Sequence, residues 1–275
     1  MPEAALEAYE AALSSICTGV SFFHNTTMDR WRVEGLKPVG RDEPALAAAL
    51  ALAASISGCD AALERAPTSP DGWLARSYAS FAEQLIGRRF AVRGSHQNHP
   101  PVAGRITLTL DAGLAFGSGE HETTASCLEM LEHIPGLGGM RILDLGSGTG
   151  ILAIAAVKLG AASAVAIDID EKAAASCAAN IRLNGEEDRI VPVCGELGCI
   201  RDEPYDLILA NIYADIHLAL ADAMTELAKR GGILLLSGIP LQDKFDIQVR
   251  FQRLGCRLRD MRILDEYATM LLEKG

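Results

Sequence analysis

The stretch ILDLGSGTG at residues 142–150 decides the fold of this chain. A short apolar run with the pattern of a buried strand leads into three glycines at alternate positions, and an apolar helical pattern follows over 151–159. Glycine lets a strand-to-helix turn approach a ligand closely, because it lacks a Cβ atom and adopts positive φ freely. We therefore expect a ligand-binding turn at the carboxyl end of a buried parallel strand.

Further apolar runs with the length of strands continue around this turn. The parallel candidates occupy residues 141–145, 164–168, 190–194, 205–210 and 232–237. Helical patterns mostly separate them, which is typical of a parallel sheet with helical crossovers. The last two candidates, 257–264 and 267–273, are joined by two residues only, too few for a parallel crossover. The sequence predicts an α/β fold with a doubly wound, seven-stranded sheet that ends antiparallel.

The N-terminal part has a different pattern of helix and strand signals, which predicts a small α+β domain. Its expected elements are a helix over 3–15, strands over 19–23 and 31–36, a helix over 44–57 capped by Asp42, and a third strand over 60–66. Turn-forming residues then concentrate at 67–72 and again at 94–104. We expect three parts: a small domain over 1–68, a linker or connecting region over 69–104, and a ligand-binding domain over 105–275.

The residues around the glycine turn indicate which ligand it binds. A nicotinamide-dinucleotide fingerprint would need glycine at position 151, where the chain has Ile151. Asp168 ends the next strand, 22 positions after Gly146, where a carboxylate can accept hydrogen bonds from two ribose hydroxyls. Because Asp170 is better placed to cap the following helix, Asp168 favours an adenosine-containing ligand without identifying it.

A second polar side chain falls at the same predicted edge of the sheet. The strand over 205–210 is followed by Asn211, and ligands of open α/β sheets gather where parallel strands end. An asparagine at this point can equally terminate the strand or cap the next helix. Its neighbours at the edge favour a role in ligand binding.

Charge and cysteine content exclude several classes of protein. The formal net charge of −11 and pI near 5.0 oppose loose binding to phosphate backbones, so we expect basic proteins as partners and no direct contact with nucleic acid. Seven cysteines without a C-x-x-C pair predict neither a disulfide framework nor a metal site. The acidic N-terminal segment does not resemble a signal peptide, and the alanine-rich 44–56 is too short to span a bilayer. These features predict a cytoplasmic protein without membrane contact.

Together these segments resemble the motifs of class I S-adenosylmethionine-dependent methyltransferases. The run LAFGSGEHETT at 114–124 is in addition similar to the Phe-Gly-Thr-Gly-Thr-His-Pro-Thr-Thr run of the PrmA family, which methylates ribosomal protein L11. The resemblance covers roughly 88–240 well, whereas the first seventy residues match mainly in layout. The chain departs from the family pattern at Ser118, Glu120 and Glu122, where threonine, threonine and proline are common.

The resemblance implies S-adenosyl-L-methionine as cofactor, no metal, and a Rossmann-like methyltransferase domain. The residues expected to line the cofactor pocket are Phe116, Thr124, Gly146, Gly148, Asp168 and Asn211. It also implies that domain 1–68 recognises the substrate, and that the enzyme methylates α-amines or lysines of a ribosomal protein, L11 above all. The resemblance predicts no oligomeric state.

Several alternatives stay open at the level of sequence. They are a methyltransferase of another protein lysine and a cofactor-binding scaffold without turnover. A methyltransferase of bases or glutamine amides is disfavoured, because such enzymes resemble one another in an Asn-Pro-Pro-Tyr type strand end, and this chain has NIYA at 211–214. No catalytic residue is assigned, although Asn211 could orient the amine and His121 could accept its proton. Glu120 and Glu122 either attract a basic substrate or simply face water.

Overall fold

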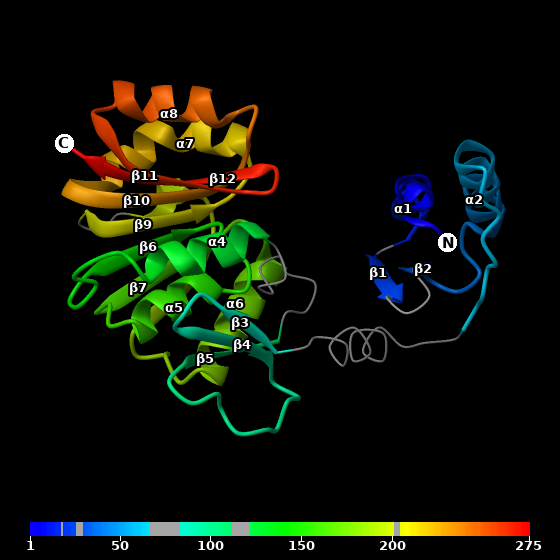
Figure 1. Cartoon of the computed structure of the whole chain (residues 1–275), viewed down its shortest axis with the longest axis horizontal. Helices are drawn as coiled ribbons and strands as arrows, with labels where there is room; N and C mark the ends of the chain where they lie inside the picture. Colours follow the sequence, from blue (N-terminus) through cyan, green and yellow to red (C-terminus); the bar gives the residue numbers. More distant parts are fainter. Residues whose placement is uncertain (18, 26–29, 67–82, 112–121, 201–203) are drawn as a thin grey trace. The chain divides into compact units, whose positions relative to one another are not determined.

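The computed structural model describes residues 1–17, 19–25, 30–66, 83–111, 122–200 and 204–275. The chain divides into two compact units, Met1–Ser80 and Phe81–Gly275 (Figure 1). In these described ranges no helix has the length and apolar character needed to cross a membrane.

The first unit contains a two-stranded sheet and two helices. The elements are η1 (Glu3–Ala5), α1 (Leu6–Ser14), β1 (Gly19–Asn25), β2 (Arg30–Leu36) and α2 (Glu43–Ser57). The two strands pair antiparallel, and buried side chains of both helices, including Tyr9 and Ala53, form a small core. The predicted helices and strand pair are therefore confirmed, and a pocket of about 1000 Å³ lies among α1, α2, β2 and residues 60–66.

Two details of the first unit differ from the sequence-based expectation. Residues 60–66 form no strand. Asp42 does occupy the N-cap position of α2, but its side chain makes no capping hydrogen bond. Its φ of 55° is left-handed, whereas a capping side chain reaches the first helical N–H groups from an extended backbone.

A seven-stranded sheet organises the second unit. Its strands are β6 (Arg141–Leu145), β7 (Ser163–Asp168), β8 (Ile190–Cys194), β9 (Tyr205–Asn211), β10 (Ala228–Pro240), β11 (Cys256–Leu264) and β12 (Tyr267–Lys274). They lie in the order β11-β12-β10-β9-β6-β7-β8. The five strands β6 to β10 run parallel, and β12 pairs antiparallel with both β10 and β11. This confirms the predicted sheet and its antiparallel end.

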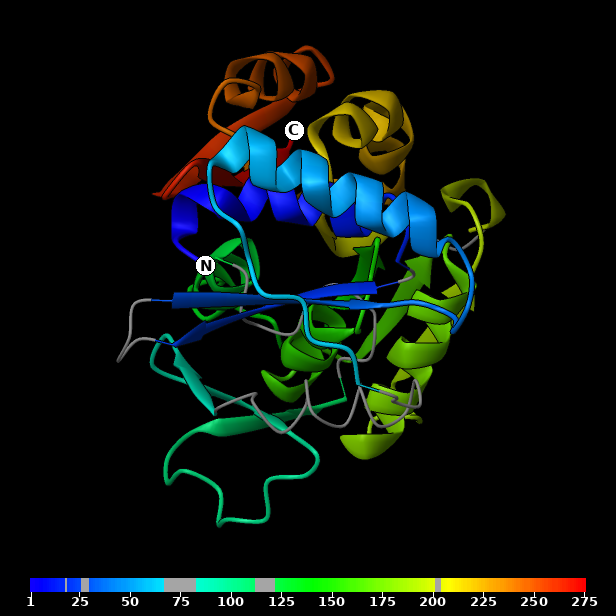
Figure 2. The same cartoon turned by 90° about the vertical axis from the view of Figure 1, so that its right-hand side faces the viewer.

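Helices cover both faces of this sheet. On one face lie α4 (Glu122–Leu131), α5 (Ile151–Lys158) and α6 (Glu171–Leu183), and on the other lie α7 (Ala214–Leu227) and α8 (Lys244–Arg253). Successive residues of β6 alternate between the two cores: Ile142 packs with the first set of helices and Leu143 with the second. Helices α7 and α8 lie side by side in both views (Figures 1 and 2).

A small second sheet extends the core beneath α4, α5 and α6. It consists of β3 (Gln84–Ile86), β4 (Phe90–Gly94) and β5 (Ile106–Leu110), with Phe90 and Leu108 fully buried. Its first two strands fall inside 69–104, which the sequence analysis assigns to connecting structure.

The strand order places three chain segments at one point. Strand β6 lies between β7 and β9, so the crossover after β6 leads to one side of the sheet, to β7, and the crossover after β9 leads to the other, to β10. Because all three strands are parallel, Leu145, Asp168 and Asn211 end them at the same edge. A crevice at such a switch point is where open α/β sheets bind ligands.

Candidate active site

The glycine turn after β6 is fixed by backbone hydrogen bonds to the neighbouring strand. The N–H groups of Gly146 and Ser147 both donate to the carbonyl oxygen of Ile167, at 2.9 and 3.0 Å. Gly146, Gly148 and Gly150 have φ angles of 68°, 53° and 80°, a region that other residues rarely adopt. The alternate glycines are therefore required by the path of this turn.

The carboxylate of Asp168 connects the end of β7 to this turn. Its Oδ2 accepts a hydrogen bond from Gly148 N–H at 2.9 Å, and its Oδ1 accepts one from Asp170 N–H at 3.0 Å. Each carboxylate oxygen has two acceptor sites, so both retain capacity for a ligand hydroxyl. Asp170 caps α6 by accepting from Lys172 N–H at 2.9 Å, which confirms the capping role predicted for it.

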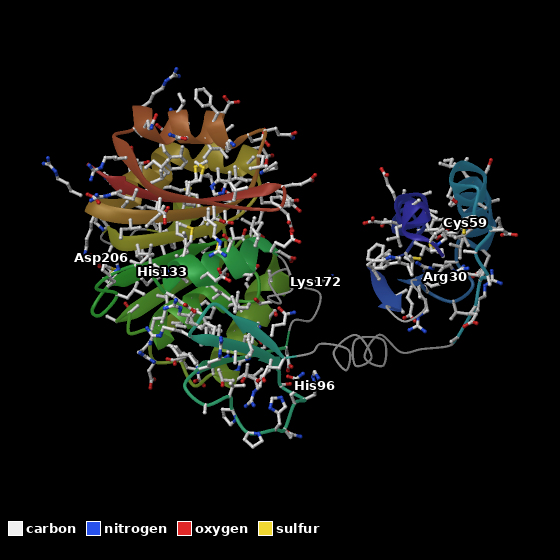
Figure 3. The ribbon with its side chains drawn as sticks, viewed as in Figure 1. Arg30, Cys59, His96, His133, Lys172 and Asp206 are labelled. Atoms are coloured by element: carbon white, nitrogen blue, oxygen red, sulfur yellow. The ribbon has the colours of Figure 1, made fainter. Side chains whose placement is uncertain are left out.

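The edge that carries Asp168 is the carboxyl edge of the sheet. Figure 3 shows Lys172, in the first turn of α6, on the opposite side of this sheet from Asp206, near the start of β9. Asp206 is satisfied there by Lys229 Nζ at 2.7 Å and by Arg141 N–H at 2.9 Å.

Asn211, at the end of β9, is held by the first turn of α4. Its Nδ2 donates to the hydroxyl oxygens of Thr124 and Thr123, at 3.3 and 3.4 Å. Its Oδ1 is buried and has no hydrogen-bond partner among the described residues. A buried acceptor without a partner is costly, so this oxygen is a strong candidate to receive a donor from a bound molecule.

A buried network supports the backbone beside Asn211. The carbonyl oxygen of Ser237 accepts from Ile212 N–H at 3.2 Å and from His217 Nε2 at 2.8 Å. The Ser237 hydroxyl lies 2.8 Å from that of Thr269 on β12. Burial lowers the pKa of His217 to about 4, so its ring is neutral at pH 7 and serves as a donor to Ser237.

The glycine turn and the end of β9 touch each other. A Cβ atom on Gly146 would lie 2.4 Å from Cγ2 of Ile212. On β10, a Cβ on Gly238 would lie 2.5 Å from the carbonyl oxygen of Ile212 and 3.2 Å from Oδ1 of Asn211. Gly146 therefore leaves room for close packing between the two halves of the site, and Gly238 leaves room for the backbone that follows Asn211.

The structure gathers most of the sequence-predicted residues into these two halves. Gly146, Gly148 and Asp168 lie together at the turn, and Thr124 lies beside Asn211. Four further predicted positions, Phe116, Ser118, Glu120 and His121, fall outside the described residues.

The sequence analysis missed the residues that support Asn211, namely Thr123, Ile212, His217 and Ser237. Only Thr123 carries a sequence signal, as the neighbour of Thr124. The other contacts join β9, α7 and β10, whose relative placement no local pattern reveals.

Asp144, in the glycine motif itself, is buried beneath the turn. Its Oδ2 accepts from Ala153 N–H in the first turn of α5 at 3.0 Å. Burial, assisted by the nearby charge of Asp168, raises the pKa of Asp144 to about 7. This carboxyl therefore stabilises the start of α5 but cannot reach a ligand as an exposed group.

These features fit a ligand that carries a ribose and further polar groups. Asp168 has free acceptor capacity, the positive-φ glycines leave no Cβ above the turn, and the buried Ser147 Oγ and Asn211 Oδ1 have no partner among the described residues. S-adenosylmethionine offers hydroxyl and ammonium donors and a carboxylate to such a site. Its adenosine would be held from Asp168 and the glycine turn, and its methyl-bearing end would lie toward Asn211.

Fold and site together define a class I S-adenosylmethionine-dependent methyltransferase. A family model described as "Ribosomal protein L11 methyltransferase (PrmA)" matches residues 24–274. The chain belongs to that family.

Individual relatives agree with this assignment. A ribosomal protein L11 methyltransferase of Desulforamulus reducens is 34% identical over 208 residues, covering 76% of this chain and 67% of the relative. One of Desulfitobacterium hafniense is 43% identical over 169 residues, covering 62% of this chain and 54% of the relative. The crystal structure of a ribosomal protein L11 methylase from Lactobacillus delbrueckii subsp. bulgaricus, 28% identical, superposes with a TM-score of 0.64 over 71% of this chain and 100% of that one.

The contact between Gly146 and Ile212 leads to a first prediction. Gly146 and Gly185 share a φ of 68°, but a Cβ on Gly185 would meet nothing within 4 Å. Gly185→Ala should lower the free energy of unfolding by about 1–2 kcal/mol, because it places a side chain in left-handed backbone, and Gly146→Ala should lower it further because its Cβ also meets Ile212. Only Gly146→Ala should weaken binding of S-adenosylhomocysteine, by about ten-fold or more, in calorimetric titration.

Adding Ile212→Ala to Gly146→Ala removes the clashing methyl group and should recover part of the lost affinity. Equal affinities in the two glycine variants would contradict the assignment of Gly146 to the cofactor site.

The raised pKa of Asp144 leads to a second prediction. Its pKa is about 7 in the folded protein and 3.8 in a free side chain, so the folded state binds more protons between these values. This carboxyl therefore lowers the stability of the wild type as pH rises from 4 to 7. Asp144→Asn keeps an oxygen acceptor for Ala153 N–H and does not titrate.

The stability of Asp144→Asn relative to the wild type should consequently increase with pH over this window, as measured by urea unfolding at several pH values. A difference that stays constant from pH 4 to pH 7 would show that Asp144 titrates normally.

Proposed function

We propose that this protein transfers methyl groups from S-adenosyl-L-methionine to amino groups of ribosomal protein L11, and that it does so in the cytoplasm. The single observation that carries the proposal is the buried Oδ1 of Asn211 beside the glycine turn, which has no hydrogen-bond partner in the described part of the chain and to which an amine can donate. The names of the relatives support L11 as the substrate. The chain spans 67% and 54% of the lengths of these two relatives, so the substrate remains part of the proposal.

The bound cofactor supplies an electrophilic methyl group, because its sulfur carries a positive charge. The protein holds and orients the molecule. Asp168 would accept hydrogen bonds from the ribose hydroxyls, and Gly146 and Gly148 would allow the backbone to approach the cofactor. Thr124 holds Asn211 in place by accepting a hydrogen bond from its side chain. Phe116 belongs to the same proposed pocket. No nucleophile from the protein is needed. The contribution of the protein is to align the substrate amine with the methyl group of the cofactor.

The accepting amine must be neutral to attack. An α-amine with a pKa of about 7.7 is neutral in roughly one molecule in six at pH 7, whereas a lysine near 10.4 almost never is. Burial lowers the pKa of an amine, so a site that excludes water favours the reactive form of lysine. In this protein Asn211 Oδ1 accepts one amine N–H and directs the nitrogen lone pair toward the cofactor, without itself removing a proton.

The two units divide recognition and chemistry. We assign substrate recognition to the small N-terminal domain, residues 1–68, and methyl transfer to 105–275, with 69–104 as the connection between them. The pocket of about 1000 Å³ and the exposed Leu52 and Ile56 on α2 support the first assignment, because they offer apolar surface to a polypeptide. The net charge of −11 favours a basic ribosomal protein as the partner over nucleic acid.

A methylation assay with two variants of Asn211 tests the function. The wild type, Asn211→Ala and Asn211→Asp are incubated with methyl-labelled cofactor and purified L11, and modified residues are located by mass spectrometry. We expect label on L11 from the wild type and a kcat about 100-fold lower for Asn211→Ala, since a misplaced amine loses alignment. Asn211→Asp retains an acceptor and should lose less.

The affinity for S-adenosylhomocysteine separates the causes of a failure. It should stay within about five-fold of wild type in Asn211→Ala. An unchanged kcat in that variant would remove Asn211 from the reaction, and absence of label from a wild type that binds the cofactor product would eliminate L11 as the substrate.

A further inference from the structure

Large apolar side chains are exposed at the carboxyl edge of the sheet, beside Asn211. Tyr213 is 79% exposed, Phe245 69%, Ile216 40% and Tyr267 39%. Tyr213 is the N-cap residue of α7, Ile216 lies in the first turn of that helix, Phe245 lies in the first turn of α8, and Tyr267 begins β12. We call these four residues the edge patch. Exposed aromatic residues that gather in one place commonly mark a surface that binds another molecule.

Register and hydrogen bonds bring the edge patch together. Ser237 of β10 pairs with Asn211 of β9, and Pro240 of β10 pairs with Tyr267 of β12. Leu241 N–H also donates to the carbonyl oxygen of Glu266 at 2.9 Å. Neighbouring strands are about 4.8 Å apart, so the patch spans three adjacent strand ends. Helices α7 and α8, which carry Ile216 and Phe245, pack against each other (Figure 2).

Carboxylates border the edge patch. They are Glu122, Asp215, Asp243, Asp246, Asp265 and Glu266, and Lys244 is the one basic residue in the same segments. Among the residues the structure describes, none of these carboxylates forms a salt bridge, whereas Asp206 at the amino edge is paired with Lys229. A hydrogen bond with Asp265 and the charges of Asp265 and Glu266 raise the pKa of Glu122, the effect expected where carboxylates crowd together.

We infer that the edge patch and its acidic border dock a lysine- or arginine-rich segment of the protein substrate next to the amine that is methylated. The inference rests on the proposed function and extends it. Apolar side chains and the aliphatic stems of the segment's basic residues cover the patch, while the charged ends of those residues meet the carboxylates at its border. Arginine or lysine can in addition stack on the exposed rings of Tyr213 and Phe245. This surface lies within the methyltransferase unit and supplements recognition by the N-terminal domain.

The test compares two triple variants in the full-length protein. The patch variant is Phe245→Ser with Asp243→Lys and Asp246→Lys. The matched control is Val191→Ser with Glu187→Lys and Asp188→Lys, which changes one exposed apolar residue and two exposed acids near the start of β8, at the amino edge of the sheet. For each, we measure the KM for purified L11, kcat, the affinity for S-adenosylhomocysteine, and the dependence of KM on salt.

The inference predicts a KM at least ten-fold higher in the patch variant, with kcat and cofactor affinity within two-fold of wild type and no such change in the control. It also predicts that salt raises the wild-type KM more steeply than that of the patch variant, because ionic contacts are screened. Equal KM values in both variants, with methylation intact, would overturn the docking surface and leave the proposed function standing. A wild type that binds S-adenosylhomocysteine but transfers no methyl to L11 would overturn both.

Discussion

The hydrogen bond between the Asp168 carboxylate and Gly148 N–H is the interaction on which the rest of the site depends. It joins the end of β7 to the turn after β6 at 2.9 Å, while the second oxygen of the carboxylate accepts from Asp170 N–H. The turn is therefore set by the strand that follows it in the chain. Because two N–H groups already orient the carboxylate, its remaining lone pairs have fixed directions before a ligand binds. Such preorganisation lowers the cost of binding.

The opposite half of the site depends on β9, β10 and α4. Asn211 is oriented by the threonines of α4, and the peptide that follows it is held by the Ser237 carbonyl, which also accepts from His217. His217 is fully buried and neutral, so the network does not change its charge near physiological pH. Contact between Gly146 and Ile212 connects this half to the turn. The alignment of the two reactants that we propose therefore depends on elements of the sheet and needs no catalytic base.

The fold could be predicted because the central parallel strands β6, β7 and β9 are largely buried on both faces and read as apolar runs. Ile142 and Leu143 enter different cores, so the sequence of β6 shows no polar alternation, and its neighbours behave alike. The cap at Asp170 was also predictable, since helix capping depends on local geometry. The capping hydrogen bond predicted for Asp42 does not form, because the turn before α2 gives this residue a left-handed φ.

Contacts between distant segments could not be predicted in this way. The hydrogen bond between Asn211 and Thr123 joins residues 88 positions apart, and no pattern in either segment predicts this contact. Likewise, the hydrophobic character of Phe245 and Tyr213 is visible in the sequence, but their exposure is not. Helices and strands can be predicted from the periodicity of a single sequence, whereas the partners of a side chain depend on how those elements pack.

The most direct test of this account is calorimetric titration of S-adenosylhomocysteine into the wild type, Asp168→Ala and Asp170→Ala. The two aspartates are two residues apart, and each accepts a backbone N–H, but only Asp168 contacts the glycine turn. The account predicts that Asp168→Ala lowers affinity by about 100-fold, equivalent to about 2.7 kcal/mol. Asp170→Ala should lose about 1 kcal/mol of stability as a removed cap and keep its affinity within about three-fold. Equal losses of affinity in both variants, or none in Asp168→Ala, would contradict it.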